Sequence, residues 1–146
     1  MILPIILYNN KKNKKILRNK NYNVKKHINI NNIINDMFET MIFNNGIGLS
    51  APQIGININL FIIGINNKKM VFINSKIEKY STKKVFSKEG CLSLPNFNKI
   101  LKRKKYILAK YYDYKWKKHN KKIKKDLSII FQHEYDHIKG KLIIDY

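Results

Sequence analysis

Apolar residues recur at intervals of three and four between residues 30 and 44, as they do on one face of an α-helix. The positions are Ile30, Ile33, Ile34, Met37, Phe38, Met41 and Ile42. This pattern predicts an amphipathic helix over residues 30–44, in the N-terminal part of the chain. Gly46 is expected to act as its C-terminal stop, because glycine tolerates the backbone that ends a helix.

Short runs of β-branched and aromatic residues follow this helix, and they predict strands. Residues 59–65 and 70–74 flank Asn66-Asn67, which indicates a hairpin or two neighbouring strands. Further strands, with lysines on the solvent side, are predicted at residues 80–86, 105–112 and 114–118. The sheet is therefore expected to be antiparallel or mixed.

A second helix is predicted near the C-terminus. Residues 121–125 are interpreted as a basic turn, and the helix is expected to begin near Asp126 as N-cap and to end at Gly140. Residues 9–26, rich in Asn and Lys, are interpreted as a solvated loop. Helix, strands and helix in this order predict the α+β class.

The charge of the chain is strongly positive. Its 146 residues carry 30 Lys and Arg against 9 Asp and Glu, a formal net charge of +21, and the length allows one domain. Lys, Asn and Ile make up 74 residues (28, 20 and 26), and only 2 basic residues are Arg. A dedicated nucleic-acid binder would use more Arg, so the charge predicts only salt-sensitive, unspecific attraction to polyanions.

Neither a membrane span nor export is indicated. The longest apolar runs, residues 1–7 and 60–65, are far shorter than the roughly 18 residues that a membrane helix needs. Positive charge follows the first apolar run, whereas in a secretory signal it precedes the run. The single cysteine, Cys91, cannot form an intrachain disulfide, which favours a reducing compartment, the cytoplasm or an organelle interior.

Three segments depart from the Lys, Asn and Ile background and are the best candidates for chemistry. They hold the single cysteine, five of the six glycines and two of the four histidines. Their sequences are GIGLSAPQIG at residues 46–55, EGCLSLP at 89–95 and QHEYDHIKG at 132–140.

The last of these segments contains a His-Glu-x-x-His pattern. His133 and His137 are four residues apart on a predicted helix, so both imidazoles can reach one metal ion, and Glu134 can approach a water on it. The pattern predicts a hydrolytic metal site; the alternative is a pair of ordinary histidines on a helix surface. The other two histidines, His27 and His119, are predicted to face solvent.

A catalytic metal of this type needs a third protein ligand, and Cys91 is the strongest candidate. A thiolate suits Zn²⁺ or Fe²⁺. Two alternatives stay open at this point, namely an inert buried cysteine and a nucleophile paired with a histidine.

Residues 46–55 directly follow the first predicted helix. A phosphate-binding loop is excluded, because no strand precedes the glycines and the Lys-Ser/Thr pair is missing. The small side chains would let a substrate backbone approach, and Gln53 offers an amide N–H for an oxyanion. A plain helix stop and turn is the alternative.

Together and in this order, the three segments resemble the signature motifs of the peptide deformylase family. Residues 1–5, 36–41 and 140–146 are also similar to family sequence, so the resemblance covers nearly the whole chain. It implies one catalytic domain over residues 1–146, with small sheets around a central helix that bears the His-Glu-x-x-His pattern. The implied activity is removal of the formyl group from N-terminal formyl-methionine of new polypeptides, with release of formate.

The resemblance also implies roles for individual residues. Cys91, His133 and His137 would bind one metal ion, natively Fe²⁺, with Zn²⁺ or another divalent ion able to occupy the site. Glu134 would be the general acid and base.

The same resemblance implies how substrate would be held. The Gln53 side chain and the backbone N–H of Leu92 would stabilise the oxyanion. Gly48 and Gly90 would let the substrate lie alongside as an added strand. The methionine pocket is expected to be lined by Ile47, Ile129, Ile130 and the edge of His133.

A supporting pair is expected next to these residues. The family pairs the glutamate at position 89 with a downstream arginine, and Arg103 is one of only two arginines in this chain. We expect a bidentate Glu89–Arg103 clamp that braces the Cys91 loop. A surface arginine in a lysine-rich stretch is the alternative.

The implied partners are N-formyl-methionyl nascent peptides, with no specific nucleic acid and no membrane. Many relatives continue beyond the position of Tyr146 into a helix that docks on the ribosome, whereas here the basic surface is expected to make unspecific contacts with the ribosome surface. Two rival interpretations are an RNA-binding or ribosomal protein, which explains neither Cys91 nor the His-Glu-x-x-His pattern, and a generic zinc peptidase.

Overall fold

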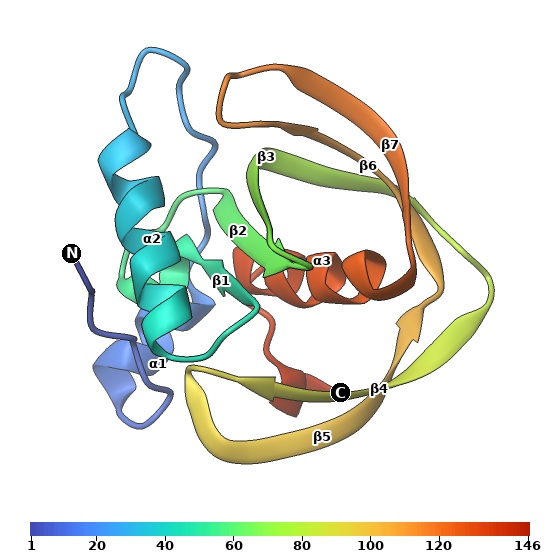
Figure 1. The fold of residues 1–146 in the computed structure, drawn as a ribbon. Helices are drawn as coiled ribbons and strands as arrows, with labels where there is room; N and C mark the ends of the chain where they lie inside the picture. Colours follow the sequence, from blue (N-terminus) through green and yellow to red (C-terminus); the bar gives the residue numbers. More distant parts are fainter.

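The computed structural model describes residues 1–146, which form three α-helices and seven β-strands (Figure 1). The helices are α1 (Lys11–Arg18), α2 (Asn31–Phe43) and α3 (Lys125–Ile138). The strands are β1 (Gly48–Ser50), β2 (Leu60–Ile65), β3 (Lys68–Tyr80), β4 (Lys84–Cys91), β5 (Leu94–Lys104), β6 (Tyr106–Tyr112) and β7 (Lys118–Lys124). Two short 3₁₀ turns lie at Ala51–Ile54 and Ile143–Asp145.

The strands form two antiparallel sheets. One has five strands in the order β1-β2-β3-β6-β7, and the other is the hairpin β4-β5. In Figure 1, α3 lies at the centre of the molecule with strands around it, and it contacts both sheets. The predicted α+β class with antiparallel sheets is therefore confirmed.

The two long helices pack on opposite faces of the five-stranded sheet, because side chains alternate along β2. Leu60 and Ile62 join the apolar cluster under α2, whereas Phe61 and Ile63 join the cluster under α3. Phe61 also packs edge-on against Phe131 of α3, with ring centroids 4.9 Å apart. Strand β2 is thus buried on both faces, and it holds α3 firmly in the middle of the molecule.

The predicted first helix and hairpin are both present. Helix α2 covers Asn31–Phe43, and β2 and β3 are joined by Asn66-Asn67, where both residues have positive φ (51° and 59°). Asparagine tolerates this backbone, which suits a tight hairpin turn. The stop of α2 differs from the prediction, since Asn45 takes the positive φ of 57° rather than Gly46.

Several predicted strand boundaries are wrong. Residues 80–86 do not form one strand: β3 ends at Tyr80, the chain turns, and β4 begins in the other sheet at Lys84. Residues 114–118 are mostly a turn, and the presumed basic turn at 121–125 is mostly β7. The strand β5 was not predicted at all. Lysine-rich strands with one solvent-exposed face contain few apolar residues. Their ends therefore cannot be located from hydrophobic periodicity.

Helix α1 lies where a solvated loop was predicted. The side chain of Asn10 accepts a hydrogen bond from the N–H of Asn13 and so caps the helix, and Leu17 is fully buried. At the other helix, α3, the N-cap residue is Lys124, and the predicted cap Asp126 lies in the first turn. Gly140 follows the end of α3 with φ 71°, as a C-terminal stop should.

Candidate metal centre and active site

Helix α3 presents both histidines of the pattern on one face. Its other face is apolar and packs into the core through Phe131, Tyr135 and Ile138. This packing turns His133 and His137 toward β4, with ring centroids 5.2 Å apart. The helical spacing of four residues therefore places two imidazoles side by side.

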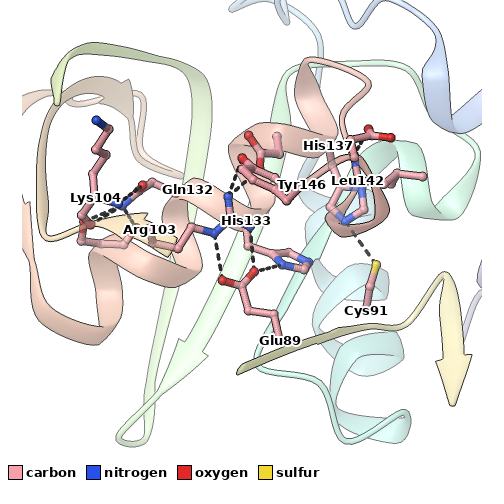
Figure 2. Close-up of polar contacts among 12 residues, drawn as sticks. Glu89, Cys91, Arg103, Lys104, Gln132, His133, His137, Leu142 and Tyr146 are labelled. Carbon is pink, nitrogen blue, oxygen red and sulfur yellow. Dashed lines mark hydrogen bonds and ion pairs between the residues drawn. The ribbon is translucent and has the colours of Figure 1, made fainter. Parts of the chain in front are cut away.

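Strand β4 brings the third donor to this pair. Cys91 is the last residue of β4, where the pairing with β5 shifts register after Gly90. Its Sγ lies 3.4 Å from Nε2 of His137, and the ligand atoms of Cys91, His133 and His137 all lie within 4.8 Å of one another (Figure 2). One thiol and two imidazoles at this separation suit a tetrahedral Zn²⁺ or Fe²⁺ site with a free fourth position.

A chain of charged groups supports His133 from behind. Its Nδ1 lies 2.8 Å from Oε1 of Glu89, which leaves Nε2 free for a metal. Glu89 is held by Arg103 through two hydrogen bonds of 2.8 and 2.7 Å, so the predicted bidentate clamp is present. Arg103 is only 2% exposed, and it also donates to Asp136 (2.6 Å) and to the hydroxyl of Tyr146 (2.9 Å). Figure 2 shows this network joining β4, β5, α3 and the last residue.

Electrostatics keep this network charged. Burial raises the pKa of Glu89, but the hydrogen bonds from Arg103 and His133 outweigh it and hold the pKa at about 2. Burial lowers the pKa of His133, but contacts with Cys91 and Glu89 raise it to about 10, so a metal must displace a proton there. Burial and the nearby His133 hold the pKa of His137 well below its ordinary value, and that imidazole is neutral.

Glu134 is buried and closely packed. It is 3% exposed, and its Oε2 has no hydrogen-bond partner within the protein. Burial raises its pKa to about 7, against the attraction of His133. A Cβ atom on Gly48 would lie 2.6 Å from Oε1 of Glu134, so only glycine leaves room for this carboxyl group. A carboxyl group with such a pKa can take up and release a proton near neutral pH.

Gln53 is oriented by its neighbours in the turn after β1. Its Oε1 accepts hydrogen bonds from the backbone and hydroxyl groups of Ser50, both at 3.0 Å. The Nε2 group is therefore aimed at Ser93 (3.3 Å to Oγ) and at Cys91 (3.5 Å to Sγ). The amide thus points its N–H donors toward the metal-ligating cluster.

A cleft of about 740 Å³ opens above these groups and is called the catalytic cleft below. It lies between the segment before β1 and the strands β4 and β5. All but one of the residues predicted for the site line this cleft: Ile47, Gly48, Gln53, Gly90, Cys91, Leu92, Ile129, Ile130, His133 and Glu134. His137 lies beneath it and is 1% exposed.

Sequence reasoning missed several supporting residues. Asp136 and Tyr146 bind Arg103, and the amide of Gln132 ties α3 to the backbone of Lys104 with bonds of 2.9 and 3.0 Å. The chain has only 9 acidic residues, so an aspartate next to the predicted metal ligands, such as Asp136, could have been singled out from the sequence. His119 was predicted to face solvent, but it is half-buried and lies 2.8 Å from Asp113.

Fold and site together point to a class: a small α+β protein with a Cys-His-His cluster and an adjacent glutamate, a set of groups that suits a metal-dependent hydrolase. The family model for polypeptide deformylase matches residues 2–146. A peptide deformylase of Karelsulcia muelleri is 52% identical over 99% of this chain and 78% of its own length.

Solved structures agree with this match. The crystal structure of the Thermotoga maritima peptide deformylase superposes with a TM-score of 0.92 at 32% identity, over 99% of this chain and 97% of that one. The crystal structure of the Ehrlichia chaffeensis peptide deformylase in complex with actinonin superposes with a TM-score of 0.92 at 31% identity, over 99% of this chain and 88% of that one. The chain belongs to the peptide deformylase family, metalloenzymes that hydrolyse the N-formyl amide of formyl-methionine.

Proposed function

We propose that residues 1–146 act as one catalytic domain that removes formyl groups from the formyl-methionine end of nascent polypeptides and releases formate. The observation that carries this proposal is the cluster of Cys91, His133 and His137 beneath a cleft, with Glu134 beside it. The cleft is open to an extended peptide end, and its floor holds the groups that amide hydrolysis needs.

The metal site is proposed at Cys91, His133 and His137, with one ion per chain. The donor set fits Fe²⁺, the proposed native ion, and Zn²⁺ or another divalent ion could replace it. When bound, the ion would supply an acidified water and a Lewis acid for the formyl oxygen. Glu89 holds the imidazole of His133 in the orientation that this requires.

Glu134 is proposed to move the proton. Its carboxylate would accept a proton from the attacking water and then donate it to the departing amine nitrogen. Burial favours the protonated form of this carboxyl group and so raises its pKa toward neutral pH, which suits a group that must do both. Gly48 contributes by leaving the space that this carboxyl group occupies.

Two donors are proposed to hold the oxyanion that forms at the formyl carbon. Nε2 of Gln53 is aimed at the cluster by Ser50 and Ser93, and the backbone N–H of Leu92 would be the second donor. Because Gln53 is 2% exposed and held at both ends, little reorganisation would be needed as charge develops.

The substrate is proposed to lie as an added strand between Gly48 and Gly90, which both line the catalytic cleft. The methionine side chain would enter the apolar part of the catalytic cleft beside Ile47, Ile129, Ile130 and the edge of His133.

The experiment is formate release from a formyl-Met peptide by anaerobically purified protein, with metal content read on the same sample. His133→Ala should lose both metal and activity. His27→Ala, on an exposed histidine, should keep both. Cleavage of internal peptide bonds without formate would instead support a generic zinc peptidase, and bound metal without either product would refute the proposal.

We further propose that the protein works in the cytoplasm or an organelle interior, and that its basic surface makes unspecific contacts with the ribosome. None of the three helices has the length and apolar character needed to cross a membrane. Co-sedimentation with ribosomes should be seen at low salt and vanish at moderate salt. Absence of co-sedimentation at low salt would refute the ribosome contact.

A further inference from the structure

A second cavity, of about 710 Å³, lies on the other side of Ile129 from the catalytic cleft. Its walls come from the turn between β3 and β4, the junction of β5 and β6, the end of β7 and the start of α3. We call it the lysine cavity, because five lysines line it: Lys83, Lys105, Lys122, Lys124 and Lys125. Apart from Ile129 it shares no lining residue with the catalytic cleft.

The lysines of this cavity face one shared hollow. Five of its 12 lining residues are lysine, about the same share as among the exposed residues of the chain, where 24 of 62 are lysine, but here they surround a concave space. Asp126 is the single carboxylate among them. None of the five lysines has a carboxylate within 4.0 Å, since the only lysine in an ion pair is Lys110, with Glu78. The concave wall thus concentrates cations without counter-ions, which favours an anionic ligand.

Hydrogen bonds hold the walls of the cavity in place. The backbone N–H of Ser81 donates to Tyr106 (2.9 Å), and that of Lys105 donates to Lys83 (3.0 Å). The hydroxyl of Ser81 donates to the Lys83 carbonyl (2.7 Å) and accepts from the Tyr106 N–H (3.2 Å). The two connections between the sheets are therefore tied to each other, and the backbone that carries Lys83 and Lys105 is held in place.

Two aromatic rings lie among these cations. The Phe86 side chain is 74% exposed and Tyr106 is 36% exposed, although large apolar rings are normally covered. Lys102 Nζ lies 5.2 Å from the Phe86 ring centroid, and Lys122 Nζ lies 4.1 Å from that of Tyr106. Exposed aromatic rings beside cations can stack on the bases of a nucleic acid while the cations bind its phosphates.

We propose that the lysine cavity binds single-stranded nucleic acid, with phosphates at the lysines and bases against Phe86 and Tyr106. Lys122 and Lys124 are two residues apart on β7, so their side chains leave the same face of the strand about 7 Å apart. Recognition is independent of sequence, because lysine is a point charge and the cavity has no arginine fork to read base edges. An acidic peptide would use the lysines but would bring no bases to stack on the two rings.

The test is a fluorescence anisotropy titration with a labelled oligouridine of about ten nucleotides. The variant Lys105→Gln/Lys122→Gln/Lys124→Gln should bind about tenfold or more weakly at about 0.1 M salt. Each phosphate contact contributes about 0.7 to the slope of log affinity against log salt, so the slope should fall by about 2.

The matched control removes the same three charges from exposed positions of α1, with Gln at Lys11, Lys12 and Lys15. It should bind oligouridine within about twofold of the unmodified protein. Equal losses in both variants would overturn the proposal, because general charge would then explain the binding.

The aromatic part is tested by Phe86→Ala, on a ring exposed enough that the fold should be kept. Its affinity for oligouridine should fall about fivefold or more with an unchanged salt slope. A duplex RNA, whose bases are already stacked, and a polyglutamate of equal charge should bind more weakly than oligouridine. Duplex or polyglutamate binding as tight as that of oligouridine would overturn the single-strand assignment.

Discussion

The two cavities that share Ile129 differ in electrostatic character. The catalytic cleft is lined by 23 residues of which only Lys88 is a lysine, whereas the lysine cavity has five lysines among 12. Behind the cleft, the buried guanidinium of Arg103 meets two carboxylates, Glu89 and Asp136. In the lysine cavity the cations lie in solvent without partners.

This difference shows where the lysine-rich composition is tolerated. A solvent-exposed lysine costs little free energy. Replacing another exposed residue by lysine therefore changes the stability of the fold only slightly. A buried charge without a partner costs several kcal/mol, so each group around Glu89 depends on its neighbours. Single changes should therefore have large effects at the catalytic cleft and small effects on catalysis at the lysine cavity.

The largest effect is expected from Glu134→Gln, which keeps the shape of the side chain and removes its proton transfer. Formate release should fall by about 10³-fold with an unchanged melting temperature. The control Glu78→Gln makes the same chemical change at an ion pair on the surface of β3 and should keep full activity. A Glu134→Gln enzyme within tenfold of the original would contradict the assignment.

The second largest effect on activity is expected from Gly48→Ala, which adds a methyl group at this position. Its Cβ would lie 2.6 Å from Glu134 Oε1, so the carboxyl group must shift, and a displacement of this kind costs about 10²-fold in rate. Gly64→Ala is the matched control, because there the added Cβ meets the flexible end of Met41 at 2.8 Å. If both alanine variants release formate equally fast, Gly48 does not set the position of Glu134.

Changing each of the two arginines in turn should distinguish an effect on metal binding from an effect on the stability of the fold. Arg103→Lys keeps the charge but loses the bidentate contact, and we expect metal affinity to fall about tenfold to a hundredfold. Arg18 binds Asp145 and the Gly140 carbonyl and makes no hydrogen bond to Cys91, His133 or His137. Arg18→Lys, which also keeps the charge, should therefore lower the melting temperature and leave metal affinity unchanged. Metal content after dialysis against a chelator distinguishes these outcomes. Equal metal retention in both variants would refute a bracing role for Arg103.

A smaller effect is expected on acid stability. The pKa of Glu89 is about 2 in the folded protein against an ordinary 4.5, so its ionised form stabilises the fold above pH 4.5. That stabilisation should be lost as the pH falls from 4.5 toward 2. Urea unfolding of the metal-free protein and of Glu89→Gln should show a difference at pH 6 that shrinks over this range. A difference that is constant with pH would contradict the pKa.

The smallest effect on catalysis is expected from the lysine cavity. The variant Lys105→Gln/Lys122→Gln/Lys124→Gln should release formate from a short peptide within about twofold of the original rate, because exposed charges contribute little to stability or to a distant reaction. A loss above tenfold on a short peptide would show that the two cavities are coupled across Ile129.

Elements with strong apolar periodicity were predictable, and those without it were not. The α2 and α3 helices and the Asn66-Asn67 hairpin have local patterns that determine their structure. Lys and Asn make up five of the eleven residues of β5 and five of the eight residues of α1, and formation of these elements depends on partners such as β4 or on the burial of Leu17. Propensity alone cannot show such tertiary support.

The chemical groups and their local spacing are specified by the sequence alone: two histidines and a glutamate on one helix, a single cysteine, and glycines where close approach is needed. The sequence therefore indicated the family, which the comparisons confirmed, while the individual catalytic roles stay predictions.

Which distant groups meet depends on the tertiary fold. Cys91 contacts His137 across 46 residues of chain, and Arg103 joins Glu89, Asp136 and Tyr146 from three different segments. The lysine cavity likewise forms where two connections between sheets meet the start of α3. The physical reason is that helical periodicity places neighbours within one turn, whereas contacts between elements depend on sheet register and core packing, which no local pattern encodes.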